Sequence, residues 1–293
     1  MLVATEGRQL RLRGIDLWVE DSGAGSRCVV FAHGLFWDTR LFAPQIETLR
    51  SNWRCVAYDH RGQGRSERPP GAYDIDTLTD DAIALIEHLN AGPVHFVGLS
   101  MGGFVGLRVA LKRPDLLASL ALLNTSAEPE PAAHRWRNGL LRIAARCFGI
   151  AAVSGWLMPL MFGAAVRADP TRAAELAGYR ARINAHDRSA ILKAVDAVLT
   201  RAGLSAQLPQ IATPTLIIAS DQDRATPPAT SEAMRAALPN ARLTVLADTG
   251  HSSTLESPAA VNAALADFLS TIDNRAEPPS SIVAIEDQSS PAS

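Results

Sequence analysis

A stretch of ten residues, Val94 to Gly103, constrains the fold of this chain most strongly. A β-favouring run leads into Gly98-Leu99-Ser100-Met101-Gly102, and a segment with apolar residues at helical spacing follows it. A strand that turns this sharply into a helix strains the residue at the turn and leaves room only for glycine on either side. The pattern therefore predicts that the Ser100 hydroxyl stands exposed at the carboxyl end of a strand.

A glycine-rich loop that cradles phosphate is the alternative interpretation of this segment. Its glycines lack the spacing of a Rossmann loop, and the segment has no lysine at the position that a Walker loop requires. A serine nucleophile at the turn is therefore the better interpretation.

The rest of the sequence alternates between strand-like and helix-like segments. Strands are predicted at 28–32, 54–59, 94–97, 117–123, 215–219 and 243–246, and helices at 75–89 and 104–112. Residues 9–13 and 15–20, on either side of Gly14, predict an antiparallel pair at the edge of the sheet. The alternation predicts an α/β fold with a mostly parallel central sheet flanked by helices.

The alternation lapses between residues 126 and 208. This stretch is rich in Ala, Arg, Leu and Met and is interrupted by Gly and Pro, which favours several short helices over sheet. We therefore expect an α/β core formed by 1–125 and 209–274, with 126–208 inserted as a helical cap. Residues 275–293 are rich in Pro and Ser with hardly any aromatic residues, and this composition predicts a disordered tail.

Composition narrows the classes of partner. The 293 residues carry a net charge of -2 and are 47% hydrophobic, as in a soluble globular protein with no electrostatic preference for nucleic acid. No stretch is long and apolar enough to cross a bilayer, and the start lacks a signal-peptide pattern, so we expect a cytoplasmic protein with no membrane partner. The three cysteines, Cys28, Cys55 and Cys147, lack zinc-binding spacing and are interpreted as reduced packing residues. These observations are also compatible with a homo-oligomer.

His251 is the predicted base for Ser100. A serine hydroxyl is a poor nucleophile at neutral pH and must lose its proton to a nearby base as it attacks. His251 lies just after the last predicted strand, in a loop that would reach the carboxyl edge of the sheet. The other six histidines are expected on a surface helix, in a strand, in the cap or in loops with structural tasks: His33, His60, His88, His95, His134 and His186.

Two aspartates compete for the acid that orients this histidine. Asp221 and Asp223 both follow the strand at 215–219 and precede His251, the chain order of a Ser-Asp-His triad. Asp223 lies further from the strand, whereas Asp221 is placed to cap or tighten the turn. We therefore predict Asp223 as the acid, because only one carboxylate can hold the imidazole tautomer.

Negative charge on the carbonyl oxygen during attack needs backbone N–H donors. Met101 follows the nucleophile at the amino end of a helix, whose dipole also favours an anion. The second donor should come from the loop after His33 and Gly34, where Leu35 is our choice and Phe36 the reserve. Phe36 is also a candidate substrate contact. His33 is expected to bond to backbone and to shape this loop.

The segment from Tyr58 to Ser66 also follows a predicted strand. Its glycines could suggest phosphate binding, but no helix opens at the required offset. A charged structural turn that supports the active-site face is the better interpretation.

Several short motifs carry a resemblance to a known superfamily. They are His33-Gly34, Asp59-x-Arg61-Gly62-x-Gly64-x-Ser66, the turn from Gly98 to Gly102, Asp223 with Pro227, and Gly250-His251 with Glu256 and Pro258. In these motifs the chain resembles the α/β-hydrolase superfamily over nearly its whole ordered length. The resemblance implies the α/β-hydrolase fold and a triad of Ser100, His251 and Asp223.

Within the superfamily, the chain is most similar to the 3-oxoadipate enol-lactonase group and to neighbouring small carboxylesterases. The supporting segments are His95 to Gly103, Leu123 to Ala127 and Asp223 to Pro228. The resemblance implies a serine hydrolase that cleaves a small carboxylic ester or lactone through an acyl-enzyme, with no metal or organic cofactor. Epoxide hydrolases and haloalkane dehalogenases share the fold but use an aspartate nucleophile, so Ser100 argues against both.

Other functions are compatible with the same residues. Carbon–carbon bond hydrolysis, acyl transfer and perhydrolysis use the same triad, and a non-catalytic ligand sensor of this fold can retain it. An enol-lactone also carries a carboxylate, which a pair of arginines in the cap, Arg135 and Arg137, could hold while Trp136 covers its apolar part. The alternative, which we favour, places these three residues on the solvent face of an Arg-rich helix.

Overall fold

The computed structural model describes residues 6–276 except 24, 26, 132 and 134. Its strands form one eight-stranded sheet in the order β1-β2-β4-β3-β5-β6-β7-β8. The strands of the described residues are β1 (Glu6–Leu12), β2 (Ile15–Asp21), β3 (Cys28–Ala32), β4 (Arg54–Tyr58), β5 (Val94–Leu99), β6 (Leu117–Leu123), β7 (Thr215–Ser220) and β8 (Ala241–Leu246). The helices are α1 (Ala43–Leu49), α2 (Ile75–Leu89), α3 (Met101–Lys112), α4 (Arg135–Phe148), α5 (Ser154–Met161), α6 (Ala164–Ala168), α7 (Ala173–Asn184), α8 (Arg188–Leu199), α9 (Pro228–Ala237), α10 (Ser253–Glu256) and α11 (Pro258–Ala276).

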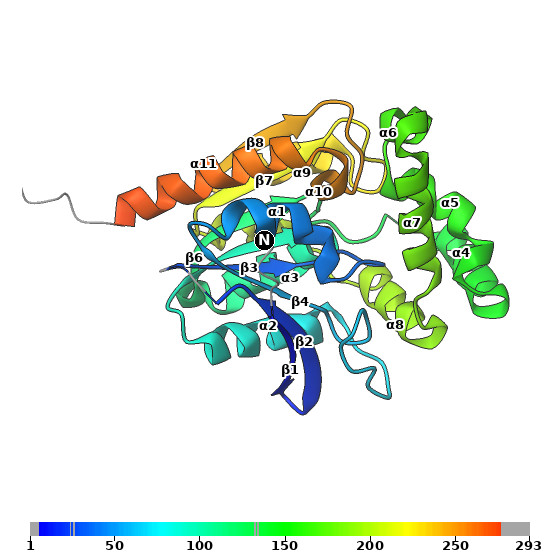
Figure 1. Ribbon diagram of the computed structural model, residues 1–293, viewed down its shortest axis with the longest axis horizontal. Helices are drawn as coiled ribbons and strands as arrows, with labels where there is room; N and C mark the ends of the chain where they lie inside the picture. Colours follow the sequence, from blue (N-terminus) through cyan, green and yellow to red (C-terminus); the bar gives the residue numbers. More distant parts are fainter. Residues whose placement is uncertain (1–5, 24, 26, 132, 134, 277–293) are drawn as a thin grey trace, which may run out of the picture.

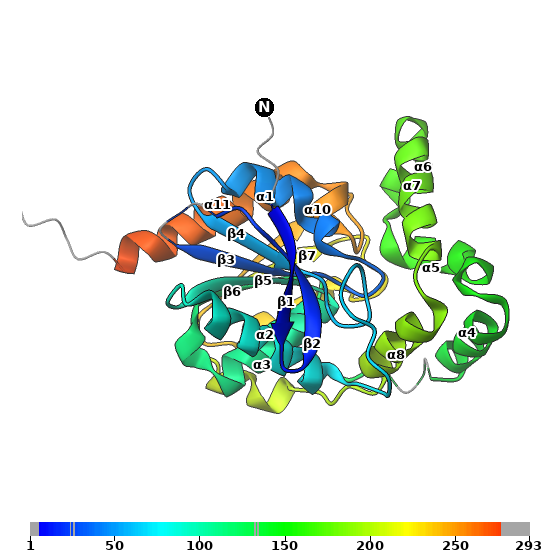
Figure 2. The same ribbon diagram turned by 60° about the horizontal axis from the view of Figure 1, so that its bottom comes forward.

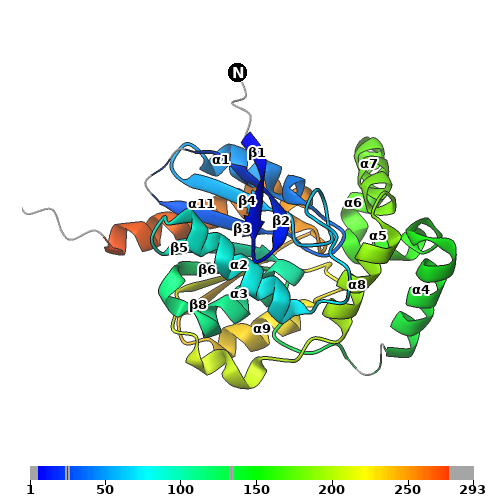
Figure 3. The same ribbon diagram turned by 90° about the horizontal axis from the view of Figure 1, so that it is seen from below.

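The sheet is parallel from β4 to β8 and antiparallel at its first edge. β1 pairs with β2 and β2 with β4 in antiparallel register, as predicted for the hairpin around Gly14. The α1 and α11 helices cover one face of the sheet, and α2, α3 and α9 cover the other (Figure 3). Every residue of β3, β5 and β7 is buried, because helices cover both faces of a parallel sheet of this kind. This arrangement confirms the predicted α/β-hydrolase fold.

The chain between β6 and β7 is helical. It forms α4 to α8, which stand together beside the sheet, with α4 at the outer edge of the molecule (Figures 1 and 2). We call these five helices the helical insertion. Its outermost helix exposes three large apolar side chains, Leu140, Ile143 and Phe148. The prediction that 126–208 forms an inserted helical cap stays a prediction.

Three expectations differ from the structure in detail. Helix α3 begins at Met101 rather than at residue 104, because the glycines after Ser100 are part of its first turn. Cys28 and Cys55 are buried, but Cys147 is exposed on the outer face of α4, so its interpretation as a packing residue was wrong. The last helix, α11, includes Arg275 and Ala276, and the remainder of the predicted tail, 277–293, lies outside the described residues.

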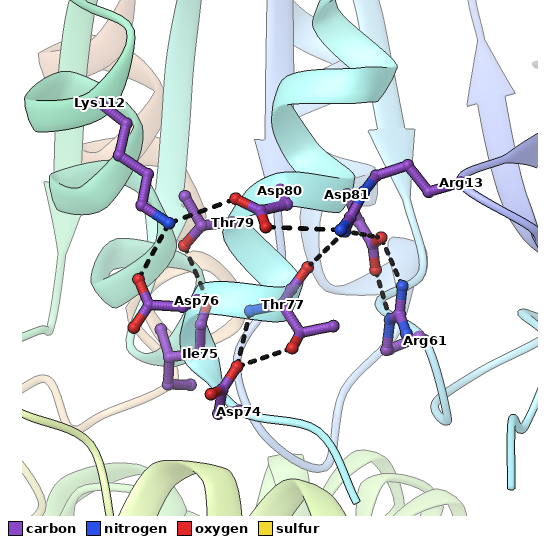
Figure 4. A network of polar contacts seen from close by, with 10 residues as sticks. All are labelled: Arg13, Arg61, Asp74, Ile75, Asp76, Thr77, Thr79, Asp80, Asp81 and Lys112. Carbon is purple, nitrogen blue, oxygen red and sulfur yellow. Dashed lines mark hydrogen bonds and ion pairs between the residues drawn. The ribbon is translucent and has the colours of Figure 1, made fainter. Parts of the chain in front are cut away.

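An ion-pair network joins the loop after β4 to helix α2 (Figure 4). Asp81 is buried on α2 and accepts hydrogen bonds from Arg61 Nε and Nη2, both at 2.5 Å, and from Arg13 Nη1 at 3.0 Å. At the start of α2 the Asp74 carboxylate accepts the Thr77 N–H at 2.7 Å, a standard N-terminal cap. Because Arg61 belongs to the segment from Tyr58 to Ser66, the network anchors that segment to the helical layer.

Among the described residues, no helix is long and apolar enough to span a membrane.

Candidate active site

Ser100 lies between β5 and α3 in a strained turn. Its backbone has φ 53° and ψ −112°, a region that residues with a side chain rarely adopt. A Cβ on Gly98 would collide with the carbonyl oxygen of Gly102, and one on Gly102 would collide with that of Ala32. The Ser100 N–H donates to the Leu123 carbonyl at 2.9 Å, which ties the turn to the end of β6. The turn has the form that the sequence predicts.

His251 lies in the loop between β8 and α10 and forms a close pair with Asp223. The two are joined at 2.8 Å between His251 Nδ1 and Asp223 Oδ2, and both side chains are almost fully buried. Burial by itself disfavours the charged imidazolium, but the Asp223 carboxylate outweighs burial and raises the pKa of His251. Because Nδ1 is bonded to Asp223, the other ring nitrogen, Nε2, is available for a different partner.

The Asp223 carboxylate is held by more bonds than the one to His251. It accepts hydrogen bonds from Asn124 Nδ2 at 3.0 Å, from Thr226 Oγ1 at 2.7 Å, and from the N–H groups of Ala225 and Thr226 at 2.8 and 3.0 Å. Burial opposes its ionisation, yet the charge of His251 and these donors keep the pKa of Asp223 below its ordinary value. The carboxylate is therefore fixed in the form that can orient and stabilise an imidazolium.

Asp221, the competing aspartate, takes a different place. Its side chain is exposed, and Oδ1 accepts the Thr249 N–H at 3.2 Å. This contact tightens the turn between β7 and the loop that carries His251. The structure brings Asp223, and not Asp221, to the histidine.

Ser100 and His251 both line a cavity of about 220 Å³ between the sheet and the helical insertion. No hydrogen bond joins Ser100 Oγ to the His251 ring in this structure. Catalytic hydrogen bonds are often long before a substrate binds and shorten in the complex with substrate. A wider surface depression of about 530 Å³ lies beside Trp18 and Arg65, and its lining includes neither Ser100 nor His251.

The predicted oxyanion hole involves the loop after His33, where Leu35 and Phe36 line the cavity, and Met101, which directly follows Ser100. The Phe36 N–H donates to Gln63 Oε1 at 3.1 Å and is therefore occupied. The N–H groups of Leu35 and Met101 have no hydrogen-bond acceptor within the described part of the chain. This geometry favours Leu35 over Phe36 as the second donor. Phe36 itself has φ 68° and lines the cavity, as expected of a substrate contact.

The segment from Tyr58 to Ser66 supports this loop. Besides the contact of Gln63 to Phe36, the Asp59 carboxylate accepts the N–H groups of Thr39 and Arg65, both at 2.7 Å. Burial raises the pKa of Asp59 to about 6 despite these two donors. His33 Nε2 accepts the His60 N–H at 3.0 Å, so His33 bonds to backbone and shapes the loop, as the sequence indicates.

Asn124 is a site residue that the sequence reasoning did not identify. It follows β6 with φ 47°, and its Nδ2 lies within hydrogen-bond distance of Ser220 Oγ (2.9 Å) and the Gly250 carbonyl (3.3 Å) as well as of Asp223. The side chain thus links the ends of β6 and β7 to the histidine loop. An asparagine directly after a buried strand was the available signal, because Asn tolerates the left-handed conformation.

Glu256 is a second site residue; the sequence motifs include it beside His251 but give it no role. Its carboxylate is buried and accepts the N–H groups of both neighbours of His251, Gly250 at 3.0 Å and Ser252 at 3.1 Å. It also accepts the N–H of Gly163, from the helical insertion, at 2.8 Å. Burial raises the pKa of Glu256 even though three donors surround the carboxylate. Glu256 therefore connects the histidine loop to the insertion.

Further bonds join the insertion to the same loop. The Ser252 N–H also donates to the Met161 carbonyl at 3.0 Å, and Arg172 donates to the carbonyls of Leu255 at 2.8 Å and Glu256 at 3.0 Å. The α5–α6 side of the insertion is therefore bonded to the core at the position of His251.

The predicted carboxylate clamp falls at the start of α4. Arg135, Trp136 and Arg137 begin α4, but their side chains lie outside the described residues. Later residues of the same helix, Asn138 and Leu141 among them, line the cavity. The clamp stays a prediction.

Comparison with known sequences relates the chain to named hydrolases. The family described as "Alpha/beta hydrolase family" matches residues 29–264. A protein named "Putative carbamate hydrolase RutD" from Pseudomonas syringae pv. syringae (strain B728a) is 34% identical over 254 residues, which cover 85% of this chain and 95% of that relative. One of the same name from Caulobacter segnis is 32% identical over 253 residues, covering 84% and 92%.

Comparison with solved structures also relates the chain to hydrolases. The enol-lactonase from Burkholderia xenovorans LB400 is 29% identical with a TM-score of 0.83, covering 90% of this chain and 100% of that chain. A thermophilic esterase from Thermogutta terrifontis is 26% identical with a TM-score of 0.84, covering 91% and 99%. The resemblance seen in the sequence motifs is confirmed by these matches, and the chain belongs to the Alpha/beta hydrolase family.

Proposed function

We propose that this protein is a serine hydrolase of small carboxylic esters or lactones, with Ser100 as nucleophile, His251 as base and Asp223 as the acid that orients His251. The observation that carries the proposal is the position of Ser100 on one cavity wall together with the paired His251. The N–H group of Leu35, which lines the same cavity, and that of Met101, directly after Ser100, would receive the oxyanion.

The proposed reaction has two halves. Ser100 Oγ attacks the carbonyl carbon while its proton passes to His251 Nε2, and the carbonyl π electrons move to oxygen. Collapse of this intermediate breaks the ester C–O bond, and the leaving oxygen takes the proton from His251. Water then attacks the acyl-enzyme, gives a proton to His251, and the second collapse releases the acid and returns the proton to Ser100. A lactone yields one hydroxy acid, because its leaving oxygen stays attached to the acyl chain.

The cavity supports a small substrate. A volume of about 220 Å³ is below the usual range for drug-sized ligands. Much of its wall is apolar and comes from α4, α5 and α8, among them Leu141, Leu157 and Val195. An acyl group of a few carbons suits this space better than a long lipid chain.

Carbamate hydrolysis is a second candidate, and the named relatives favour it. The chain covers 95% of the first relative above, which is named as a carbamate hydrolase. Attack by Ser100 on a carbamate carbonyl would follow the same first half, with the amine or the alcohol as leaving group.

A substrate panel separates these possibilities. We expect multiple turnovers of 4-nitrophenyl acetate by the purified protein, and comparison of kcat/KM for δ-valerolactone, ethyl butyrate and phenyl carbamate ranks the three classes. Labelling of wild type, but not of Ser100→Ala, by a fluorophosphonate would identify the nucleophile. A single stoichiometric acylation without turnover would instead support a ligand sensor, and labelling that persists in Ser100→Ala would refute the assignment of Ser100.

A further inference from the structure

His186 connects the helical insertion to the loop that carries a proposed oxyanion donor. It lies between α7 and α8, and its Nε2 is 2.9 Å from the Phe36 carbonyl oxygen. The two rings also meet edge to face, with their centres 6.3 Å apart. A half-buried side chain of the insertion therefore bonds to the main chain of the core one residue after Leu35.

The carbonyl fixes the direction of this hydrogen bond. A carbonyl oxygen can only accept, so Nε2 of His186 must carry the hydrogen. Burial lowers the pKa of His186, although the bond to Phe36 opposes this effect. The ring is therefore neutral at neutral pH and donates as the Nε2–H tautomer. A protonated ring would donate from the same nitrogen, so the bond does not depend on the charge of His186.

Phe36 is held in a backbone conformation that its side chain disfavours. The Trp37 N–H donates to the Gly34 carbonyl at 3.2 Å, which closes a four-residue turn with Leu35 and Phe36 at its centre. Phe36 is the third residue of this turn and has φ 68°, a value at which glycine or asparagine is usual. A strained residue of this kind persists only when its surroundings determine its conformation.

Hydrogen bonds on both sides of Phe36 determine that conformation. Gln63 Oε1, from the core, accepts the Phe36 N–H at 3.1 Å. His186 Nε2, from the insertion, donates to the Phe36 carbonyl. Removal of the His186 donor would leave the positive φ of Phe36 supported from the side of the core alone.

The same turn lies directly against the proposed nucleophile. A Cβ on Gly34 would be 3.3 Å from the Cβ of Ser100, and Leu35, Phe36 and Ser100 line one cavity. The Leu35 N–H belongs to the peptide between Gly34 and Leu35, which is part of the turn. Hydrogen bonds weaken steeply when the donor is misaligned, so the bond from Leu35 to an oxyanion depends on the conformation of the turn.

We propose that His186 is a positioning residue for the oxyanion hole: through the Phe36 carbonyl it keeps the turn in the conformation that presents the Leu35 N–H to the reacting carbonyl. This inference rests on the proposed function and extends it, because it gives the helical insertion a part in the reaction beyond the wall of the cavity. The proton transfers remain with His251. Loss of His186 should therefore weaken stabilisation of the oxyanion more than binding of the substrate.

A pair of substitutions separates the donor from the bulk of the side chain. His186→Gln places an amide Nε2 donor near the position of the imidazole Nε2, whereas His186→Leu fills similar space without a donor. With 4-nitrophenyl acetate, we expect His186→Leu to lower kcat by roughly ten- to a hundredfold with KM within about threefold, a partial loss on the scale of one oxyanion donor. His186→Gln should recover most of this loss. Equal kcat values for wild type and His186→Leu would overturn the proposal.

Lys193→Met is the matched control. Lys193, on α8, donates from Nζ to the Pro69 carbonyl at 3.0 Å, which is another bond between the insertion and the core but does not involve residues 34–37. This variant should keep the kcat of wild type. Equal losses of kcat in Lys193→Met and His186→Leu would mean that any weakened contact of the insertion has this effect, and the assignment to His186 would be wrong.

The pH profile distinguishes positioning from proton transfer. The midpoint of kcat/KM against pH belongs to His251 and should be the same in wild type, His186→Gln and His186→Leu. A midpoint that moves in either variant would show that His186 takes part in proton transfer and would contradict a positioning role.

A readout that needs no activity keeps this inference apart from the proposed function. Amide signals of protein labelled with ¹⁵N-leucine and ¹⁵N-phenylalanine report the turn directly by nuclear magnetic resonance. We expect the signals of Leu35 and Phe36 to shift or broaden in His186→Leu and to stay near their wild-type positions in His186→Gln and Lys193→Met. A wild type without turnover would contradict the proposed function alone. Unchanged signals of the turn in His186→Leu would refute the role of His186, whatever the activity of that variant.

Discussion

Gly163 and Gly250 touch through their backbones, so closely that a Cβ on Gly250 would collide with the nitrogen of Gly163. Gly163 precedes α6 in the helical insertion, and Gly250 immediately precedes His251. The contact leaves no space for a side chain on either residue, since a Cβ on Gly163 would lie 2.9 Å from the Gly250 nitrogen. The insertion and the histidine loop therefore meet as two backbones.

Gly250→Ala should damage both stability and activity. Its methyl group must displace the backbone of Gly163 or of the histidine loop, and overpacking of this kind costs about 1–3 kcal/mol. Thermal unfolding and kcat on 4-nitrophenyl acetate measure the two effects. Gly178→Ala is the control, because nothing lies within 4 Å of that site on α7 and alanine favours a helix. Equal effects of both substitutions would refute the importance of the contact.

The proposed triad predicts an order of severity among substitutions. Ser100→Ala and His251→Ala should each lower kcat by about a million-fold if the three residues act as a unit. Asp223→Asn should cost about ten-thousandfold, because the amide favours the wrong imidazole tautomer, whereas Asp221→Asn should have little effect. Steady-state kinetics with circular dichroism as a folding control measures both aspartate variants. A more severe loss in Asp221→Asn would show that the wrong acid is assigned.

The pH profile should reflect the raised pKa of His251. The imidazole acts as a base only when it has lost its proton, and its pKa lies above the ordinary 6.5 because Asp223 favours the charged form. Activity should therefore be absent at low pH and rise through a midpoint above 6.5, and Asp223→Asn should move that midpoint downward. The profile of kcat/KM against pH measures this. A midpoint below the ordinary histidine value in wild type would contradict the ion pair.

Glu256 should act on the reaction through His251. The negative charge of Glu256 contributes to the raised pKa of His251, and its carboxylate accepts the N–H groups on both sides of that residue. Glu256→Gln should lower kcat by about ten- to a hundredfold, because the amide nitrogen cannot accept a backbone N–H. The midpoint of the pH profile should fall as well.

Two control variants show whether Glu256 positions His251 or only stabilises the fold. Glu256→Asp keeps the charge and should restore the midpoint, even if its shorter side chain leaves kcat reduced. Glu232→Gln, on the exposed surface of α9, should leave the profile in place. A loss of Tm in Glu256→Gln with an unchanged midpoint would mean that the residue only stabilises the fold.

The core of this fold could be predicted because its signals are local. The run from Leu117 to Leu123 forms β6 and the periodic segment from Ile75 to Leu89 forms α2, each with the predicted limits. Position along the turn was enough to choose Asp223 over Asp221. Asp223 lies two residues further from the end of the strand.

The contacts around the site could not be predicted, because they join segments that are far apart in sequence. Asn124 meets Asp223 across 99 positions, and Glu256 meets Gly163 across 93. No periodicity or spacing encodes such a pairing.

The bonds that hold the Asp223 carboxylate come from the core. Asn124 belongs to the end of β6, Ala225 and Thr226 belong to the turn of Asp223 itself, and His251 follows β8. The helical insertion contributes none of these donors, although it supplies much of the cavity wall. Mutations that reshape α4 or α8 can therefore accumulate without disturbing this carboxylate, which leaves the shape of the cavity free to diverge in evolution. Transfer of α4 and α8 from a relative into this chain is consequently a practical route to a new specificity.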